Sequence, residues 1–592
     1  MNATQIAITA SRKARACFAS LFTLGVTTGA AVAVAVAAVV AALLLATASI
    51  ATAQTPARQA MGFDEARHLL GRTSFAAQVS EINDFAQLTR AEAVDRLLAE
   101  TKRQASYPAP AWSRAYERIY RPEMSQEERM QAGRRELVER GLELRTWWVA
   151  EMLATQSPFT ERMTLFWHNH FATAQIKSRS AMLLYRQNVL LRNYATGNFA
   201  ALLREIGKDP AMLIYLDGAQ NRKGAPNENF AREVMELFTL GEGNYNEQDV
   251  KEAARAFTGW SIDADTGEFR FRRALHDDGL KKVLGQEGRF NGDDLITLLL
   301  QQPATSEFVV GKLWRELVSP ETHSATAKKL AANWRAAHYE IKPLLREMLL
   351  TEAFWAPENR GVLVKSPVDL VIGSLRQFRF SVEDPAPFAV ILRQLGQDLF
   401  NPPNVKGWPG GEAWLNTTTL LARKGFLNRL FRADEMVKPA ADAAMLTAAN
   451  ATASMNSALV PGQSAAQLMD KDLPGAGRQR AQMRLAARGT QASAETMTTA
   501  TIATIATTAT ATATTATSPD TLPAFGVANQ LRGQYFFNAE QWFAQQPKQR
   551  EMHDDVIWRT VLAGPPVQAA KDVPPTLSGL RSLALDPMYQ LK

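Results

Sequence analysis

The sequence of 592 residues contains a single cysteine, Cys17, near its N-terminus. The rest of the chain has no thiol, which excludes a disulfide bond and a cysteine-ligated metal site there. The chain also lacks a strong excess of one charge, because 66 Lys and Arg residues stand against 59 Asp and Glu residues. We therefore expect no nucleic acid among its partners.

Several short signatures of enzyme classes are absent as well. The sequence has no H-E-x-x-H, no G-x-x-x-x-G-K-[ST], no G-x-S-x-G and no C-x-x-C. Their absence argues against common metalloproteases, nucleotide hydrolases, lipases and thiol redox enzymes. With 46% hydrophobic and 21% charged residues, the chain is also neither collagen-like, nor disordered throughout, nor a polytopic membrane protein.

The N-terminal segment has the features of an export signal. Arg12, Lys13 and Arg15 precede 42 uncharged, mostly apolar residues, and Ala51-Thr52-Ala53 fits a cleavage site. We predict that residues 1–53 are a signal peptide or an N-terminal membrane anchor, with residues 26–50 tethering an uncleaved chain to the inner membrane. Either way the body is exported, to the periplasm or beyond the cell, and it touches the membrane only through this segment if the segment stays uncleaved.

The main body is predicted to be mainly α-helical. Apolar residues recur at intervals of three and four over many segments, which indicates amphipathic helices. These segments are 61–70, 81–99, 135–154, 181–206, 226–241, 305–318, 341–355 and 366–378. Residues 268–272 alternate with period two, and an Asp-Gly pair precedes a second apolar run at 280–284, so we expect a small β-hairpin near 268–284. The fold class is thus a multi-helix globular body over 61–432.

The composition changes after residue 432. Residues 433–520 are rich in Ala, Thr and Ser, and 496–518 are nearly all Thr and Ala. Such a stretch buries too little apolar surface to offset the entropy lost on ordering, which predicts a disordered insertion. Apolar anchors such as Trp542 and Trp558 return in residues 521–592, and we expect this C-terminal segment to pack back on the body.

A first candidate site is the run Trp167-His168-Asn169-His170. Two histidines at this spacing can share a metal ion if the backbone is extended, because alternate residues then lie on one face. On a helix they diverge by about 200° and cannot. The alternative interpretation is an aromatic core element whose histidines hydrogen-bond to neighbouring helices.

Two further motifs carry carboxylates. Glu228 and Glu233 lie on the predicted helix of 226–241, where Glu233 flanks the apolar stripe and needs a partner such as arginine or a metal. His276, Asp277 and Asp278 precede Gly279, a pattern that is ordinary for a turn but also supplies three adjacent ligands. Salt bridges and turn formation are the structural alternatives.

Trp260, Trp408 and Trp414 are candidates for a binding loop. The segment of 401–414 is dense in Pro and Gly, which indicates a rigid irregular loop. Its two tryptophans could stack on a sugar, or they could anchor the loop by packing.

Eleven stretches together resemble the bacterial family called domain of unknown function 1800. They are His68–Arg72, Glu161–Phe171, Asp209–Leu213, Tyr215–Gly218, Asn221–Arg232, Ala256–Trp260, His276–Gly279, Lys365–Val368, Gly396–Phe400, Pro403–Gly411 and Leu585–Lys592. The resemblance implies an exported, mostly helical protein, often encoded beside a second exported family of unknown function. It carries no established activity, so no catalytic residue is transferred.

Three functional hypotheses remain open from the sequence. The first is a non-catalytic envelope scaffold or partner protein, with a second exported protein as partner. The second is a metal-assisted or acid–base hydrolase of the cell envelope, which uses the His, Asp and Glu candidates and a divalent metal as cofactor. The third is a glycan-binding protein that uses the candidate tryptophans.

Overall fold

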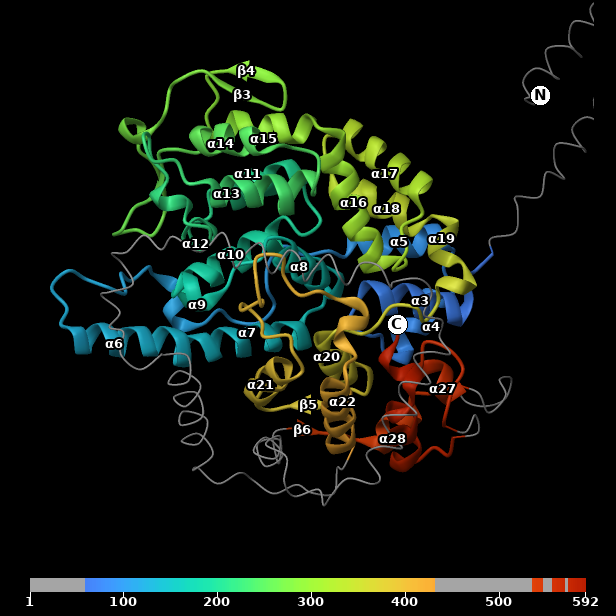
Figure 1. The fold of residues 1–592 in the computed structure, drawn as a ribbon. Helices are drawn as coiled ribbons and strands as arrows, with labels where there is room; N and C mark the ends of the chain where they lie inside the picture. The colour runs from blue at the N-terminus through green and yellow to red at the C-terminus, as the bar shows by residue number, and fades with distance from the viewer. Residues whose placement is uncertain (1–58, 432–534, 547–555, 570–572) are drawn as a thin grey trace, which may run out of the picture. The chain divides into compact units, whose positions relative to one another are not determined.

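The computed structural model describes residues 59–431, 535–546, 556–569 and 573–592 (Figure 1). The predicted signal or anchor segment, 1–53, and the predicted insertion, 433–520, lie outside these residues. Among the residues described, no helix is both long and apolar enough to cross a membrane.

Helices dominate the described chain, as the sequence predicts. The first group is α3 (Gly62–Thr73), α4 (Val79–Ala86), α5 (Arg90–Ala99), α6 (Gln126–Arg134), α7 (Gly141–Ala154), α8 (Pro158–His170), α9 (Gln175–Ser178), α10 (Ala181–Asn193), α11 (Phe199–Gly207), α12 (Pro210–Tyr215), α13 (Glu228–Glu233) and α14 (Glu247–Ala256). The second group is α15 (Gly292–Gln301), α16 (Pro303–Leu317), α17 (Ser324–Ala336), α18 (Ile341–Leu349), α19 (Glu352–Trp355), α20 (Pro367–Gln377), α21 (Ala386–Gln394), α22 (Thr417–Leu430), α26 (Ala539–Ala544), α27 (Val556–Val561) and α28 (Leu577–Leu585).

Shorter helical turns complete these elements. Turns of the 3-10 type are η1 (Ala111–Arg114), η3 (Gly218–Gln220), η5 (Arg273–Leu275), η6 (Pro357–Asn359), η7 (Gly411–Trp414) and η10 (Pro587–Gln590). Two segments are wider π-helices, η2 (Arg135–Arg140) and η4 (Val234–Leu240). The predicted helix of 226–241 is therefore an α-helix that continues as a π-helix, and its last carbonyls need partners from elsewhere.

Local side chains fix several helix starts. Asp209 precedes Pro210, and its Oδ1 accepts a hydrogen bond from the N–H of Met212 (2.9 Å) at the start of α12. Ser366 and Asp369 form a capping box at the start of α20. Each such cap contributes about 1 kcal/mol because it pairs N–H groups that the helix leaves free.

The strands form three two-stranded antiparallel pairs: β1 (Trp260–Ile262) with β2 (Phe269–Phe271), β3 (Lys281–Val283) with β4 (Gln286–Gly288), and β5 (Ser381–Val382) with β6 (Tyr535–Phe536). A mainly α fold with small hairpins near 268–284 is thus confirmed. The expected pairing of 268–272 with 280–284 is wrong, because each run pairs with a different neighbour. The turns at Gly267 and at Gly285, both with positive φ, close the two actual hairpins.

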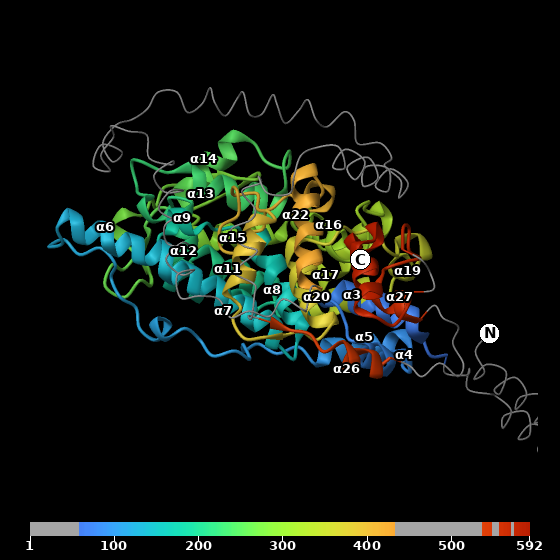
Figure 2. The same ribbon diagram turned by 90° about the horizontal axis from the view of Figure 1, so that it is seen from below.

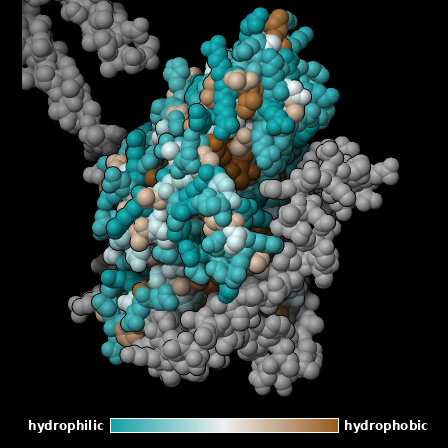
Figure 3. All heavy atoms as spheres, turned by 90° about the vertical axis from the view of Figure 1, so that its left-hand side faces the viewer, coloured by the Kyte–Doolittle hydropathy of each residue, from teal (hydrophilic) through white to brown (hydrophobic). Residues whose placement is uncertain are grey.

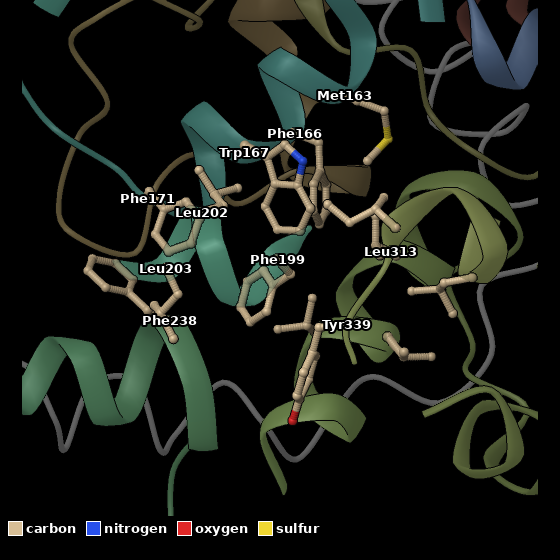
Figure 4. Close-up of a cluster of buried hydrophobic side chains, with 14 of the residues drawn as sticks. Met163, Phe166, Trp167, Phe171, Phe199, Leu202, Leu203, Phe238, Leu313 and Tyr339 are labelled. Carbon is tan, nitrogen blue, oxygen red and sulfur yellow. The ribbon is translucent and has the colours of Figure 1, made fainter. Parts of the chain in front are cut away.

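Two large groups of buried apolar side chains form the core. In the first, aromatic side chains of α8 lie against α11 (Figure 4), and the rings of Trp167 and Phe199 are 5.6 Å apart. The second surrounds α20 and α21 and includes Trp542, Leu580 and Tyr589 from the C-terminal part of the chain. Burial of each large apolar side chain contributes about 1.5–3 kcal/mol.

The described residues beyond 534 contact the body at several points. Strand β6 pairs with β5, and the Tyr589 hydroxyl hydrogen-bonds with Ser374 of α20 (2.8 Å). An antiparallel bridge joins Val364 to Leu591. Both ribbon views place the C-terminus beside α3 and α27 (Figures 1 and 2).

Candidate functional site

The two histidines of the first motif lie on one continuous helix. α8 includes both His168 and His170, and each side chain is buried. Their directions diverge by about 200°, so the expectation that they could share one metal ion is wrong. The physical reason is that the helix does not end near Trp167, as that interpretation required.

His168 lies in an aromatic environment made by Trp148, Phe400 and Trp408. Its Nε2 accepts a hydrogen bond from the main-chain N–H of Phe400 (3.2 Å). Phe400 has a left-handed φ of 62°, which a bulky residue rarely adopts. Burial, aided by Arg145, lowers the pKa of His168 to about 3, so the ring is neutral and supports this turn.

We expect His168→Ala to lower the free energy of unfolding by about 3 kcal/mol, because it leaves a cavity and an unpaired N–H at Phe400. Urea unfolding of the purified chain measures the change. The matched control is the exposed His323, whose replacement by alanine should alter stability by no more than about 0.5 kcal/mol. A fully stable His168→Ala protein would contradict the structural role and restore the acid–base hypothesis.

His170 satisfies the end of the π-helix η4. Its Nε2 donates to the Phe238 carbonyl (3.2 Å), and its Nδ1 accepts from the Lys312 ammonium (3.1 Å). Lys312 also donates to the Leu237 carbonyl (3.4 Å). Burial lowers the pKa of Lys312 to about 8, and burial together with Lys312 lowers the pKa of His170 far below its usual value. The pair therefore serves the carbonyls that η4 leaves free.

The carboxylates of α13 are placed for ion pairing. Glu228 pairs with Arg232 (3.2 Å), and Arg232 also binds Glu247 (2.7 Å). Glu233 lies close enough to Tyr215 and Tyr245 to raise the pKa of both hydroxyls, although burial is the larger cause. In the described part of the chain, neither carboxylate joins the histidines of α8 in a group that could hold a metal ion.

The third motif forms a tightly held turn. Asp277 binds Arg255 through both oxygens (2.8 and 3.2 Å), and this hydrogen bonding lowers the pKa of Asp277 to about 2. The Nδ1 of His276 contacts the Thr258 carbonyl (2.8 Å). Asp278 is exposed and lies 3.9 Å from His276 Nε2. These contacts agree with the structural interpretation of the motif, in which its residues form a turn.

The candidate residues therefore belong to separate structural clusters. Across the described ranges, no group of three His, Cys, Asp or Glu side chains is arranged to hold a metal ion. His168 supports the turn at Phe400, His170 satisfies the end of η4, Glu228 pairs with Arg232 on α13, and the turn at 276–278 lies in the β2–β3 connection. The convergence that a divalent-metal site would need is not found among them.

The three candidate tryptophans are buried. Trp260, Trp408 and Trp414 are 3, 4 and 7% exposed. Trp408 donates its main-chain N–H to Asn169 Oδ1 (2.7 Å), and Gly407 lies so close to Asn169 that a Cβ would clash. The expectation of a sugar-stacking surface is corrected accordingly, because a stacking platform needs an open ring face. These tryptophans anchor their loops by packing.

A pocket that the sequence did not predict lies elsewhere, with a volume of about 60 Å³. Its charged lining comprises Arg67 from α3, Lys365 and Asp369 at the start of α20, and Lys592. His68 also lines it, but burial and the nearby Arg72 lower the pKa of His68 to about 3, so that ring is neutral. The volume is enough for several water molecules.

Lys365 is the distinctive group of this pocket. Its Nζ lies 3.8 Å from the centre of the Tyr589 ring, and none of the described residues offers it a hydrogen-bond acceptor or a carboxylate within 4 Å. The main chain is held by hydrogen bonds with Gln590 (2.8 Å) and Arg423 (2.5 Å). The residue is half-buried, and it lines the pocket. Burial lowers its pKa to about 7, against an opposing effect of Asp369.

The one carboxylate of the lining is already engaged. Asp369 forms ion pairs with Arg162 and with Lys592 (2.7 Å), and Arg162 also binds Glu316 (2.9 Å). The Nε of Arg67 is buried and has no hydrogen-bond partner in the described chain. Three cationic side chains against one carboxylate leave the pocket electropositive, which favours an anion.

The sequence contained a signal for this pocket that the search for His and carboxylate motifs missed. His68, Lys365 and Lys592 lie in three of the stretches that carry the family resemblance, and these stretches are far apart in the chain. In the structure they line the same pocket. A lone lysine in a sequence is not a distinctive signal, because most lysines are solvated surface groups.

Comparison with known proteins decides the family. A family model described as "Protein of unknown function (DUF1800)" matches residues 68–544. The chain belongs to this family. Neither the curated proteins nor the solved structures include a significant match to this DUF1800 protein. The pocket is therefore interpreted from its own chemistry.

Proposed function

We propose that this DUF1800 protein is an exported, non-catalytic binding protein of the cell envelope that takes a small anion in the Lys365 pocket. The observation that carries the proposal is a lysine ammonium group inside the protein without a carboxylate partner in the described chain. A half-buried cation without an opposite charge beside it is unfavourable, and an anion in the pocket would relieve this. A carboxylate or a phosphate would supply that charge.

The environment of the pocket supports the same assignment. Arg67 contributes a buried donor without a partner, and Lys592 adds a second ammonium group. Export remains part of the proposal and is supported by the basic and apolar N-terminal sequence. The non-catalytic role is supported by the structural contacts of His168, His170 and Asp277, which leave the hydrolase alternative without a site of converging groups.

A large apolar docking surface is not needed for this function. On the face drawn in Figure 3, hydrophilic residues predominate and hydrophobic ones gather in small groups. A second exported protein as a docking partner stays a proposal, and on the face drawn in Figure 3 its contact would be largely polar. The pocket gives the sharper test.

We expect a small carboxylate or inorganic phosphate to raise the melting temperature of the purified full-length chain. Ligand at about 100 times its Kd stabilises by about 2.7 kcal/mol. The melting temperatures in acetate, lactate and phosphate are compared at constant ionic strength, with chloride as the reference. This comparison distinguishes binding of carboxylates from binding of phosphate. Lys365→Met should abolish the shift, whereas the exposed Lys406→Met should retain it. Equal shifts in both variants, or none with any anion, would refute the proposal.

A further inference from the structure

Lys365 differs from the other lysines that lie largely inside the protein. Lys281 donates to the Asp277 and Gly279 carbonyls (2.5 and 3.1 Å), and Lys312 donates to His170. Lys592 pairs with Asp369 (2.7 Å). Among the residues that the structure describes, the Nζ of Lys365 lies over the aromatic face of Tyr589 and has no hydrogen-bonding or carboxylate partner, and its side chain lines the pocket. Once neutral, its lone pair is free to react.

The surroundings match those of reactive amines. A lysine becomes a nucleophile when desolvation or a neighbouring cation favours its neutral form, as in lysines that form Schiff bases. Both influences act here, because burial lowers the pKa of Lys365 against the opposing attraction of Asp369, and the nearby Arg423 and Arg67 lower it further. With a pKa of about 7, roughly half of the groups are neutral at pH 7.

We infer that Lys365 captures a small carbonyl compound bearing a carboxylate or phosphate group as a reversible imine. The inference rests on the anion pocket proposed above and specifies its ligand class. Arg67 and Lys592 would hold the anionic group, which leaves the carbonyl carbon to Lys365. The volume of about 60 Å³ suits a molecule of a few non-hydrogen atoms, such as glyoxylate.

The reaction balances without another reagent. The neutral Nζ attacks the carbonyl carbon and forms a C–N bond, and the carbonyl oxygen takes up one proton. The resulting carbinolamine loses this oxygen as water, which carries both protons of the original amine, and a C=N bond remains. Amine and carbonyl compound thus give imine and water, and no oxidant or reductant is consumed. Hydrolysis of the imine reverses the reaction.

The test is reductive trapping with glyoxylate and cyanoborohydride on the full-length protein at pH 7. The reduced product carries one carboxymethyl group, and peptide mass spectrometry locates it. The neutral fraction of Lys365 is about a thousandfold larger than that of an exposed lysine, so we expect at least tenfold more label on Lys365 than on Lys406. Lys365→Arg should lose the label and Lys406→Arg should not affect it.

Two comparisons separate this inference from the proposed function. Butyraldehyde lacks the anionic group and should label Lys365 at least tenfold less than glyoxylate, and lactate should compete with glyoxylate. Label no greater on Lys365 than on Lys406, while lactate still raises the melting temperature through Lys365, would overturn the imine and leave the anion pocket standing. Equal labelling by both aldehydes without competition would overturn the anionic ligand class, and the anion pocket with it.

Discussion

Replacing Arg192 by methionine is expected to lower the free energy of unfolding by about 4 kcal/mol. Arg192 and Glu161 form a bidentate pair (2.5 and 2.9 Å) and are each 1% exposed. The variant leaves the Glu161 carboxylate with the Trp148 indole N–H (2.9 Å) as its remaining partner among these groups. Removal of one partner of a buried ion pair is strongly destabilising, because the other charge stays in a medium of low dielectric constant.

The controls for this prediction use the same chain. Lys406 and Glu242 form an exposed pair with side-chain exposures of 62 and 75%, so Lys406→Met should alter stability by less than about 1 kcal/mol. The double variant Arg192→Met with Glu161→Leu removes both charges and should recover most of the loss. Urea unfolding of the unmodified chain and of the three variants gives the four free energies of unfolding. A double variant no more stable than Arg192→Met would show that packing, rather than the unpaired charge, sets the loss.

Acidification from pH 6.5 to pH 5 is expected to remove about 3 kcal/mol of stability. The pKa values of His68 and His168 are lowered to about 3, and that of His170 is lowered further below the usual 6.5. Above pH 6.5 these rings are neutral in both states, so the full stability is present. Below pH 6.5 the unfolded chain gains protons that the folded chain excludes, and each ring removes about 1.4 kcal/mol per pH unit.

One buried carboxyl group acts in the opposite direction. Burial raises the pKa of Asp209 to about 7 from 3.8, so below pH 7 the folded chain holds a proton that the unfolded chain lacks. Asp209 therefore adds about 1.4 kcal/mol to the free energy of unfolding for each pH unit of acidification. This gain offsets the loss from one histidine, so the net loss corresponds to two histidines. Lys365, whose pKa is lowered to about 7, removes stability as the pH falls toward 7, because only the unfolded chain binds the proton there, and its effect changes little below pH 6.5.

Urea unfolding at a series of pH values from 7 to 5 measures how steeply the free energy of unfolding falls with pH. His68→Gln retains a donor for the Phe354 carbonyl and cannot titrate, so the slope should fall by about 1.4 kcal/mol per pH unit. A free energy of unfolding that is flat over this range would contradict the assigned neutral histidines.

Local rules explain why much of the fold could be predicted. The apolar spacing of 366–378 and the Ser366 and Asp369 capping box are contained in a dozen consecutive residues, and α20 forms there. The same rules broke down at 226–241, where the apolar stripe cannot reveal that the helix widens at Val234 into a π-helix. His170 and Lys312, 142 positions apart, satisfy the carbonyls that this widening exposes.

The candidate site was harder to predict because its chemistry depends on distant neighbours. His168 looks like a metal ligand in the sequence, and only the Phe400 N–H, 232 positions away, shows its structural role. In the sequence Lys365 resembles a surface lysine, and only the structure shows that its Nζ lies over the Tyr589 ring. The family motifs marked the right residues, but spacing along the chain could not show that three of these motifs meet.

The ion pair between Asp369 and Lys592 joins residues 223 positions apart. The entropic cost of closing a loop rises by only about 0.6 kcal/mol for each doubling of its length, so the large separation destabilises this pair little. Contacts of such high sequence separation nevertheless form slowly. The order of folding follows: helices α8 and α11 can consolidate early, and the Lys365 pocket can close only after residues 573–592 have reached α3 and α20. Competence to hold a ligand would thus appear last during folding.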